Sequence, residues 1–236
     1  MRSVLANAVR EELVPRNVAA LVKLPAIRRK KGKAWSSDEA RRFLESARMD
    51  RSRVYAAYVL ILVLGLRKGE VLGLTWDDVD LDAGQLTIGW QLQRVRRQLL
   101  HRETKTQASD AALPLPEICR TALKIRKQEQ DADREVAGEV WQPSNLVFTS
   151  RYGTPVEPRN FNRYFTARCD SAGVRRITVH DARRTCATLL VDLDVHPRGV
   201  MEILRHADFS VTMEIYSQAS STATREALKR LGESLD

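Results

Sequence analysis

The chain has 236 residues and a mass of 26.8 kDa, which allows one sizeable core and a small appendage, since single domains typically contain about 100 to 200 residues. Its 39 lysine and arginine residues outnumber 30 aspartate and glutamate residues, giving a formal net charge of +9 and a pI near 9.8. This excess favours a polyanionic partner, nucleic acid first and an acidic membrane second, although composition alone establishes neither.

Three cysteines are scattered along the chain without the close pairing of a zinc site or a disulfide framework: Cys119, Cys169 and Cys186. We expect reduced thiols in an intracellular, cytoplasmic protein. The longest apolar run, residues 54–66, is shorter than the ~20 residues that cross a bilayer, so it predicts a buried helix and no membrane partner. Residues 1–9 lack an export signal.

The N-terminal region differs from the rest of the chain. Residues 3–14 have apolar side chains at helical spacing, but the pattern begins abruptly. A proline-bounded stretch and the basic sequence RRKKGK at 28–33 then predict a linker, which either lies along DNA phosphates or is simply solvated. We expect an appendage and linker over 1–30 and the main domain over 31–236.

The main domain is predicted to be α+β and mainly helical. Ser36 and Glu39 form a capping-box pattern, a buried helix follows at 54–64, and a short helix carries Glu70. Alternating residues at 85–100 and a short segment at 110–115 predict a small three-stranded antiparallel sheet. The remaining expected helices cover 117–136, 158–171, 180–193, 198–205, 211–217 and 223–234.

Arg67 lies at a helix boundary directly after the buried helix, where a guanidinium is costly unless it has a partner. One interpretation is an ion pair with Glu70, three residues further on. The other is a phosphate clamp in which Glu70 orients the guanidinium, because arginine offers a planar bidentate fork. This segment alone leaves both interpretations open.

A second polar cluster joins His180 and Arg183, which share a helix face because they are three residues apart. A histidine beside an arginine is usually a surface feature. Two further residues change that weighting, because His206 and Tyr216 follow at a spacing of ten residues.

In this order, an arginine, a His-x-x-Arg motif, a histidine and a tyrosine resemble the active-site set of tyrosine recombinases of the phage integrase family. Residues 31–236 would all belong to that family's catalytic domain, and residues 1–25 resemble the end of the core-binding domain that precedes it. Three boxes in sequence order carry the resemblance: GLRKGEVLGLTW, VHDARRTCATLL and LRHADFSVTMEIYSQ.

The resemblance implies one more catalytic residue and shows two departures. The family uses a lysine on the turn between the second and third strands of its sheet, and Lys105 matches that position, although it is otherwise an ordinary hairpin lysine. Arg205 stands where the family usually has glycine, and Ala182 where leucine is common. Neither removes a catalytic group, but Arg205 is placed to crowd the site or to alter its electrostatics.

The expected chemistry needs no metal, cofactor or ATP. Arg67 and Arg183, with His206 donating, would neutralise charge on the phosphate oxygens. Tyr216 would attack the phosphorus and form a covalent 3′-phosphotyrosine, with His180 as proton acceptor and Lys105 as general acid. The sequence shows no carboxylate cluster and no His/Cys spacing of a metal site.

The expected partner is double-stranded DNA at attachment or recombination sites, with protomers forming a tetramer on DNA and a monomer alone. The segment after Tyr216 would dock on a neighbour or fold back on its own domain. Basic residues on and after the second predicted strand either contact phosphates or form a solvated face: Arg94, Arg96, Arg97 and Arg102. Two alternatives stay open, a type IB topoisomerase-like nicking and religating enzyme and an inactive DNA-binding domain.

Overall fold

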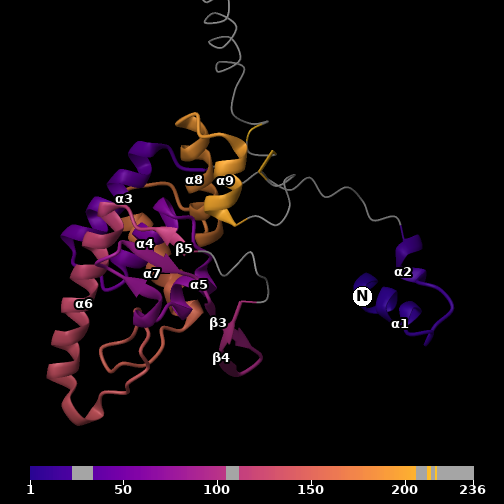
Figure 1. Cartoon of the computed structure of the whole chain (residues 1–236), viewed down its shortest axis with the longest axis horizontal. Helices are drawn as coiled ribbons and strands as arrows, with labels where there is room; N and C mark the ends of the chain where they lie inside the picture. Colours follow the sequence, from indigo (N-terminus) through magenta and orange to yellow (C-terminus); the bar gives the residue numbers. More distant parts are fainter. Residues whose placement is uncertain (23–33, 105–111, 206–211, 214–215, 217–236) are drawn as a thin grey trace, which may run out of the picture. The chain divides into compact units, whose positions relative to one another are not determined.

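The structure is a computed structural model that describes residues 1–22, 34–104, 112–205, 212–213 and 216. The chain divides into two compact units, Met1–Gly32 and Lys33–Asp236. The described part of the smaller unit contains helices α1 (Arg2–Arg10) and α2 (Val18–Leu21) (Figure 1). The Arg2 side chain donates to the Ala19 carbonyl oxygen at 2.8 Å and so ties these two helices together.

The larger unit is built mainly from helices, and Figure 1 shows the long α6 along one side of it. The four helices predicted between residues 117 and 205 match the observed ones to within one residue. Within the described ranges, none of the helices is both long and apolar enough to cross a membrane. The helices are α3 (Ser37–Met49), α4 (Tyr55–Val63), α5 (Lys68–Gly73), α6 (Glu117–Ala137), α7 (Pro158–Ser171), α8 (Val179–Asp192) and α9 (Pro197–Leu204), with 3-10 turns η1 (Trp76–Asp78) and η3 (Gly138–Val140).

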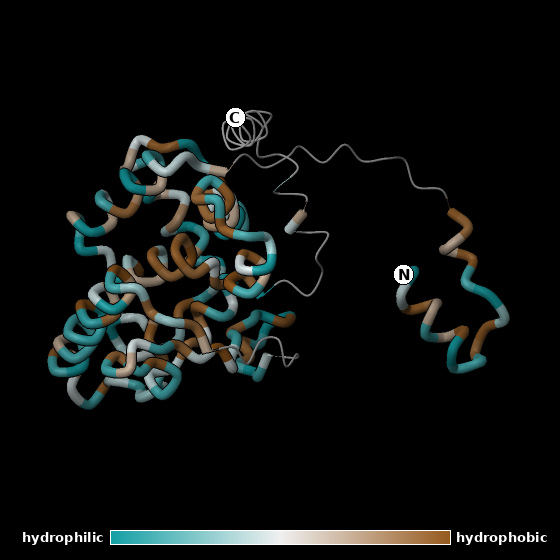
Figure 2. Tube along the Cα trace, turned by 45° about the horizontal axis from the view of Figure 1, so that its top comes forward, coloured by the Kyte–Doolittle hydropathy of each residue, from teal (hydrophilic) through white to brown (hydrophobic). Residues whose placement is uncertain are grey.

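Helix α4 forms the centre of the core because it is apolar on every side. All residues from Ala56 to Leu62 are buried, and α3, α6 and α8 pack around them. In Figure 2 the hydrophobic segments accordingly run through the interior of this unit. Aromatic rings from α3, α4 and α7 and from Trp35, which precedes α3, pack together in the core: Trp35, Phe43, Tyr58, Phe161 and Phe165.

A three-stranded antiparallel sheet is present, as predicted, but different segments form it. Its strand order is β1 (Val79–Asp80), β2 (Gln85–Thr87) and β5 (Ala112–Pro114). The alternating pattern predicts the basic segment near residue 95 as the second strand, and this prediction is wrong. Leu86 and Leu113 are buried and directly opposite one another, so the apolar pair selects this register instead.

The basic segment forms a separate hairpin of β3 (Trp90–Val95) and β4 (Gln98–Glu103), which extends from the body of the unit in Figure 1. Val95 pairs with Gln98, so the turn contains only Arg96 and Arg97. Arg96 adopts a positive φ of 54°. Two-residue hairpin turns usually carry Asn or Gly at such positions, so the residues Arg96 and Arg97 do not predict this turn or the strand that follows it.

The hairpin is closely attached to α5. A Cβ atom on Gly73 would lie 2.6 Å from the backbone carbon of Gln91, so only glycine lets the helix approach β3 this closely. The Nε2 atom of His101 on β4 lies 2.7 Å from the Gly73 carbonyl oxygen. Helix α5, which begins directly after Arg67, is therefore tied to both strands of the hairpin.

Candidate active site

Arg67 is the residue before α5, and its extended backbone places its side chain at the helix entrance. Its backbone N–H donates to Oε2 of Glu70 at 2.8 Å, and its Nη1 donates to Oε1 at 2.6 Å. Nη2 donates to the Arg205 carbonyl oxygen at 3.1 Å. The ion pair and the orienting role proposed for Glu70 are thus the same contact, and nearly half of the Arg67 side chain stays exposed.

Arg183 comes from the middle of α8 and is buried. One Nη atom donates to the Gly65 carbonyl oxygen at the end of α4, and the other donates to the Leu204 carbonyl oxygen at the end of α9. Leu204 is the last residue of α9, whose C-terminal carbonyls lack intrahelical partners, and Gly65 lies two residues beyond the end of α4. Arg183 therefore joins three helices while its guanidinium lies next to that of Arg67.

His180 lies in the first turn of α8 and is exposed. The helix begins at Thr178, whose hydroxyl accepts from the Asp181 N–H at 3.1 Å in a capping box. Together with Arg67 and Arg183, His180 lines a pocket of about 440 Å³. Three sequence-predicted residues, separated by up to 116 positions, therefore face one pocket.

The structure adds polar residues to this pocket that the sequence had not indicated. Lys68 donates to the Asn162 side chain at 3.1 Å, and Thr178 lines the same wall. Thr178 had a readable signal, because Asp181 follows it at capping-box spacing. Asn162 had none, since it is one polar residue among several on α7.

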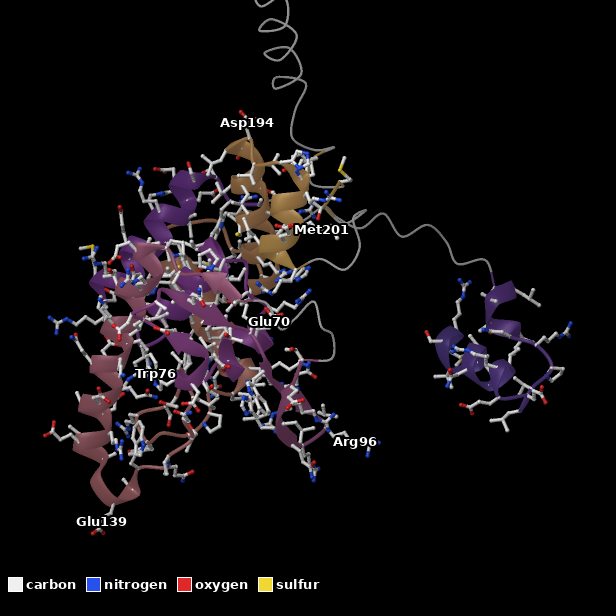
Figure 3. All side chains as sticks on the ribbon, viewed as in Figure 1. Glu70, Trp76, Arg96, Glu139, Asp194 and Met201 are labelled. Atoms are coloured by element: carbon white, nitrogen blue, oxygen red, sulfur yellow. The ribbon has the colours of Figure 1, made fainter. Side chains whose placement is uncertain are left out.

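Arg205 is the residue whose position differs most from expectation. It caps the C-terminus of α9 with a left-handed backbone (φ 52°, ψ 49°), a conformation in which glycine is usual. Its side chain turns inward, and Nη2 lies 2.7 Å from Oε2 of Glu70 (Figure 3 labels Glu70). Arg205 is not among the residues that line the described pocket, and its guanidinium is paired with the buried Glu70.

Burial dominates the titration of these groups. Burial and the nearby Arg67 charge lower the pKa of Arg183 to about 9, although Glu70 opposes this shift. Burial also lowers the pKa of Arg205. Burial alone would raise the pKa of Glu70, but Arg205 and Arg67 outweigh it and hold that pKa below its usual value. Glu70 is therefore ionised at neutral pH.

Tyr216 lies beside α8 and α9. It is half-buried against the small apolar cluster that includes Leu190 and Val195, and its hydroxyl donates to the Val195 carbonyl oxygen. Burial and the neighbouring Asp194 carboxylate raise its pKa. Its hydroxyl is thus held by the chain's own backbone and is protonated at neutral pH.

Two of the predicted catalytic residues, Lys105 and His206, lie outside the described residues. Lys105 follows β4, so it comes after the basic hairpin in the chain. His206 directly follows Arg205. Within the described part of the chain, no group of three or more His, Cys, Asp or Glu side chains is arranged to hold a metal ion.

The four basic residues predicted to contact DNA are exposed on the hairpin, but they differ in their contacts. Arg94 forms an ion pair with Glu157 and donates to the Arg97 carbonyl oxygen at 2.8 Å. Its charge is therefore partly compensated. Arg96 and Arg97 form the turn, and Arg102 lies on β4.

A solved structure shares this fold. The Tn1549 transposon integrase in complex with transposon right end DNA superposes with a TM-score of 0.76 at 19% identity, covering 98% of this chain and 76% of that chain. This similarity confirms the predicted α+β, mainly helical class.

Sequence relatives carry names of the same kind. A tyrosine recombinase XerC-like protein of Caldanaerobacter subterraneus subsp. tengcongensis is 26% identical over 211 residues, covering 84% of this chain and 54% of the relative. An integrase of Streptomyces ambofaciens is 30% identical over 220 residues, covering 89% of this chain and 55% of the relative. The chain thus spans little more than half the length of these relatives.

A family model described as the phage integrase family matches residues 33–222. The match covers Arg67, the His-x-x-Arg motif of α8 and Tyr216, the residues on which the sequence resemblance depended. The chain belongs to the phage integrase family.

Proposed function

We propose that this chain is the catalytic part of a site-specific DNA recombinase that cleaves and rejoins DNA through Tyr216. The observation that carries the proposal is that one pocket is lined by Arg67, His180 and Arg183. Glu70 forms an ion pair with Arg67. Two guanidinium groups beside a histidine suit a phosphodiester, whose anionic oxygens otherwise repel a nucleophile.

The two arginines stabilise the negative charge that develops on the phosphate during the reaction. As Tyr216 attacks, negative charge builds up on the non-bridging oxygens of the phosphate, and Arg67 and Arg183 stabilise it together with a hydrogen bond from His206. Such preorganised donors are usually the largest catalytic contribution. Because Arg183 is fixed by two helix-end carbonyls, it needs little reorganisation when the phosphate binds.

The bond changes balance without a cofactor. The Tyr216 oxygen bonds to phosphorus, His180 accepts the tyrosine proton, and the bond from phosphorus to the 5′-oxygen breaks as Lys105 donates a proton to that oxygen. The product is a 3′-phosphotyrosine and a free 5′-hydroxyl. Attack by the 5′-hydroxyl of another strand reverses these steps and completes an exchange. The Tyr216 hydroxyl must first leave the Val195 carbonyl.

The proposed partner is double-stranded DNA carrying a recombination site. The Tn1549 integrase was solved with transposon DNA, which supports this assignment. We further propose that protomers act as a tetramer on DNA, that residues 1–30 belong to a core-binding domain, and that the segment after Tyr216 docks on a neighbour or on its own domain. The names of the relatives favour recombination over topoisomerase-like religation.

The decisive test is covalent trapping on DNA. The chain is incubated with a library of randomised nicked duplexes, whose short cleaved strand diffuses away, and the trapped duplexes are recovered and sequenced. We expect a denaturant-resistant adduct with the wild type. Tyr216→Phe should bind the recovered duplex but form no adduct, because it lacks only the nucleophilic oxygen.

Tyr164→Phe is the matched control, since Tyr164 is also a partly exposed tyrosine of the same unit. It should trap DNA like the wild type. If the folded wild-type chain binds DNA without forming an adduct, the chain is an inactive DNA-binding domain. If the adduct forms but two recovered sites are never joined to each other, while supercoils relax, the chain religates as a topoisomerase does.

A further inference from the structure

Arg205 is held in an unfavourable conformation by contacts that belong to the candidate site. Its left-handed backbone is one that side chains with a Cβ atom rarely adopt. Its side chain is 1% exposed, and its Nε atom has no hydrogen-bond partner within the described residues. Backbone strain and a buried charge both oppose this arrangement, so the contact with Glu70 must compensate for them.

Glu70 is shared between two arginines. Its Oε1 atom accepts from the Arg67 guanidinium at 2.6 Å, while its Oε2 atom accepts from the Arg67 backbone N–H at 2.8 Å and from Arg205 at 2.7 Å. One carboxylate therefore faces two guanidinium charges, and the trio has a net charge of +1. Without the Arg205 guanidinium, Arg67 and Glu70 would neutralise each other.

Arg205 also contacts Arg67 through its backbone. The Arg205 carbonyl oxygen accepts from Nη2 of Arg67 at 3.1 Å, so the same residue fixes the orientation of Arg67 and occupies its carboxylate partner. Arg183 holds the adjacent Leu204 carbonyl. The end of α9 is thus connected to both arginines that line the pocket.

We propose that Arg205 is a positioning residue that shares Glu70 with Arg67 and so leaves Arg67 with more uncompensated positive charge toward a bound phosphate. This inference rests on the proposed function. It predicts that Arg205 matters in proportion to the negative charge of the phosphate. A residue that merely joins α9 to α5 would matter equally for any substrate.

Charged and uncharged substrates separate these two roles. The duplex recovered by trapping is prepared with an ordinary scissile phosphate and with a methylphosphonate, which lacks one anionic oxygen. We expect Arg205→Met to slow adduct formation on the phosphate by roughly 10- to 100-fold. Removing a group that donates directly to the reacting oxygens typically slows a reaction by about 100- to 1000-fold. On the methylphosphonate the loss should be at most a few-fold.

Charge rescue and a matched control complete the design. Arg205→Lys should restore much of the rate on the phosphate, because it returns a positive charge next to Glu70. Arg41→Met removes an exposed arginine that pairs with Asp38, and it should leave both rates unchanged. Equal losses on the two substrates with Arg205→Met would overturn the proposal and assign Arg205 to packing.

Folding is checked separately by thermal unfolding. Arg205→Gly is the second variant without the guanidinium, and glycine adopts the left-handed backbone without strain. Relative to the wild type, it should lose the same roughly 10- to 100-fold in rate on the phosphate and at most a few-fold on the methylphosphonate. If both variants unfold at the assay temperature, Arg205 acts through stability and the proposal fails. If the wild type forms no adduct on either substrate, the proposed function itself fails.

Discussion

At the scale of single residues, the candidate site contains more positive than negative charge. Arg67 and Arg205 form ion pairs with one buried carboxylate, Glu70, and Arg183 interacts with it only electrostatically. Both Nη atoms of Arg183 donate to backbone carbonyl oxygens. These hydrogen bonds fix the position of the guanidinium but do not neutralise its charge. The cluster therefore keeps excess positive charge in a poorly solvated place, where an incoming phosphate relieves the imbalance.

The pH dependence of cleavage should report this imbalance. Burial and Arg67 lower the pKa of Arg183 to about 9, so its positive charge is complete at neutral pH and is lost as the pH rises through 9. We expect the rate of adduct formation to fall across that pH. Ionisation of Tyr216 acts in the opposite direction, and in its described position burial and Asp194 oppose that ionisation by raising its pKa.

The measurement is the single-turnover rate of adduct formation against pH, with Arg205→Lys for comparison. Stability has the opposite sign. Because the pKa of Arg183 is lower in the folded chain, the unfolded chain binds more protons above pH 9, and the Arg183 contribution to stability rises with pH there. A cleavage rate that climbs steadily through pH 9 would contradict a role for Arg183 charge.

The family motifs predicted Arg67, His180 and Arg183 as parts of one site, but contacts that no motif or local spacing carries could not be predicted. The spacing of Arg67 and Glu70 predicted their pairing because three residues make one helical turn. The contact of Arg205 with Glu70 spans 135 positions and requires a left-handed residue that is not glycine. Propensity argues against that conformation, so no local pattern indicated it.

At the scale of elements, the site lies where the ends of three helices meet. Gly65 ends the buried α4 with a φ of 60°, and a Cβ atom there would lie 2.2 Å from Cδ2 of Leu204 on α9. The Gly65 carbonyl oxygen also accepts from Arg183. The sequence predicts that the buried helix ends at residue 64, but the close contact of Gly65 with α9 depends on packing.

Gly65→Ala should therefore destabilise the chain and displace α9. Gly173→Ala is the matched control, because Gly173 has the same φ of 60° but no neighbour within 4 Å of its Cβ position. We expect Gly173→Ala to cost about 1 kcal/mol and Gly65→Ala about 3 kcal/mol in the free energy of unfolding, from strain plus overpacking. Urea denaturation measures both changes in the free energy of unfolding. Equal changes would show that α9 moves aside without cost.

The strands were harder to predict than the helices. The helix periods between residues 117 and 205 are long and bounded by caps, whereas the hairpin turn at Arg96 and Arg97 carries no glycine or asparagine. Arg96 there adopts a positive φ. The run 85–100 contains β2, β3 and the start of β4, and only β2 belongs to the three-stranded sheet, so the pattern predicts the sheet but not which segments form it.

At the scale of the whole molecule, the net charge of +9 predicts salt-dependent DNA binding. The structure shows which arginines of the hairpin form ion pairs. Arg94 is paired with Glu157, whereas Arg96 and Arg97 lie at the exposed tip of the hairpin. Composition and pattern predicted a basic surface here. They did not distinguish these arginines, because Glu157 is 63 positions away from Arg94.

Salt titrations test this distinction. Each of Arg96→Ala and Arg97→Ala should reduce the slope of log affinity against log salt concentration by about 1, as expected for the loss of one phosphate contact. Arg94→Ala should reduce it less, because it also frees Glu157. Fluorescence anisotropy on one duplex measures all three slopes. Identical slopes for the wild type and the two tip variants would place the hairpin away from DNA.

The close packing of Gly73 against Gln91 gives the hairpin a second consequence. Helix α5 and β3 touch backbone to backbone, and His101 adds a contact from β4, so Arg67 and the arginine tip belong to one stiff piece. With the tip on one phosphate and Arg67 on another, the distance between them is set by the protein. Lengthening the hairpin by two residues should therefore change the spacing between these two phosphate contacts, and sequencing the recovered duplexes would show whether the cleavage position moves with it.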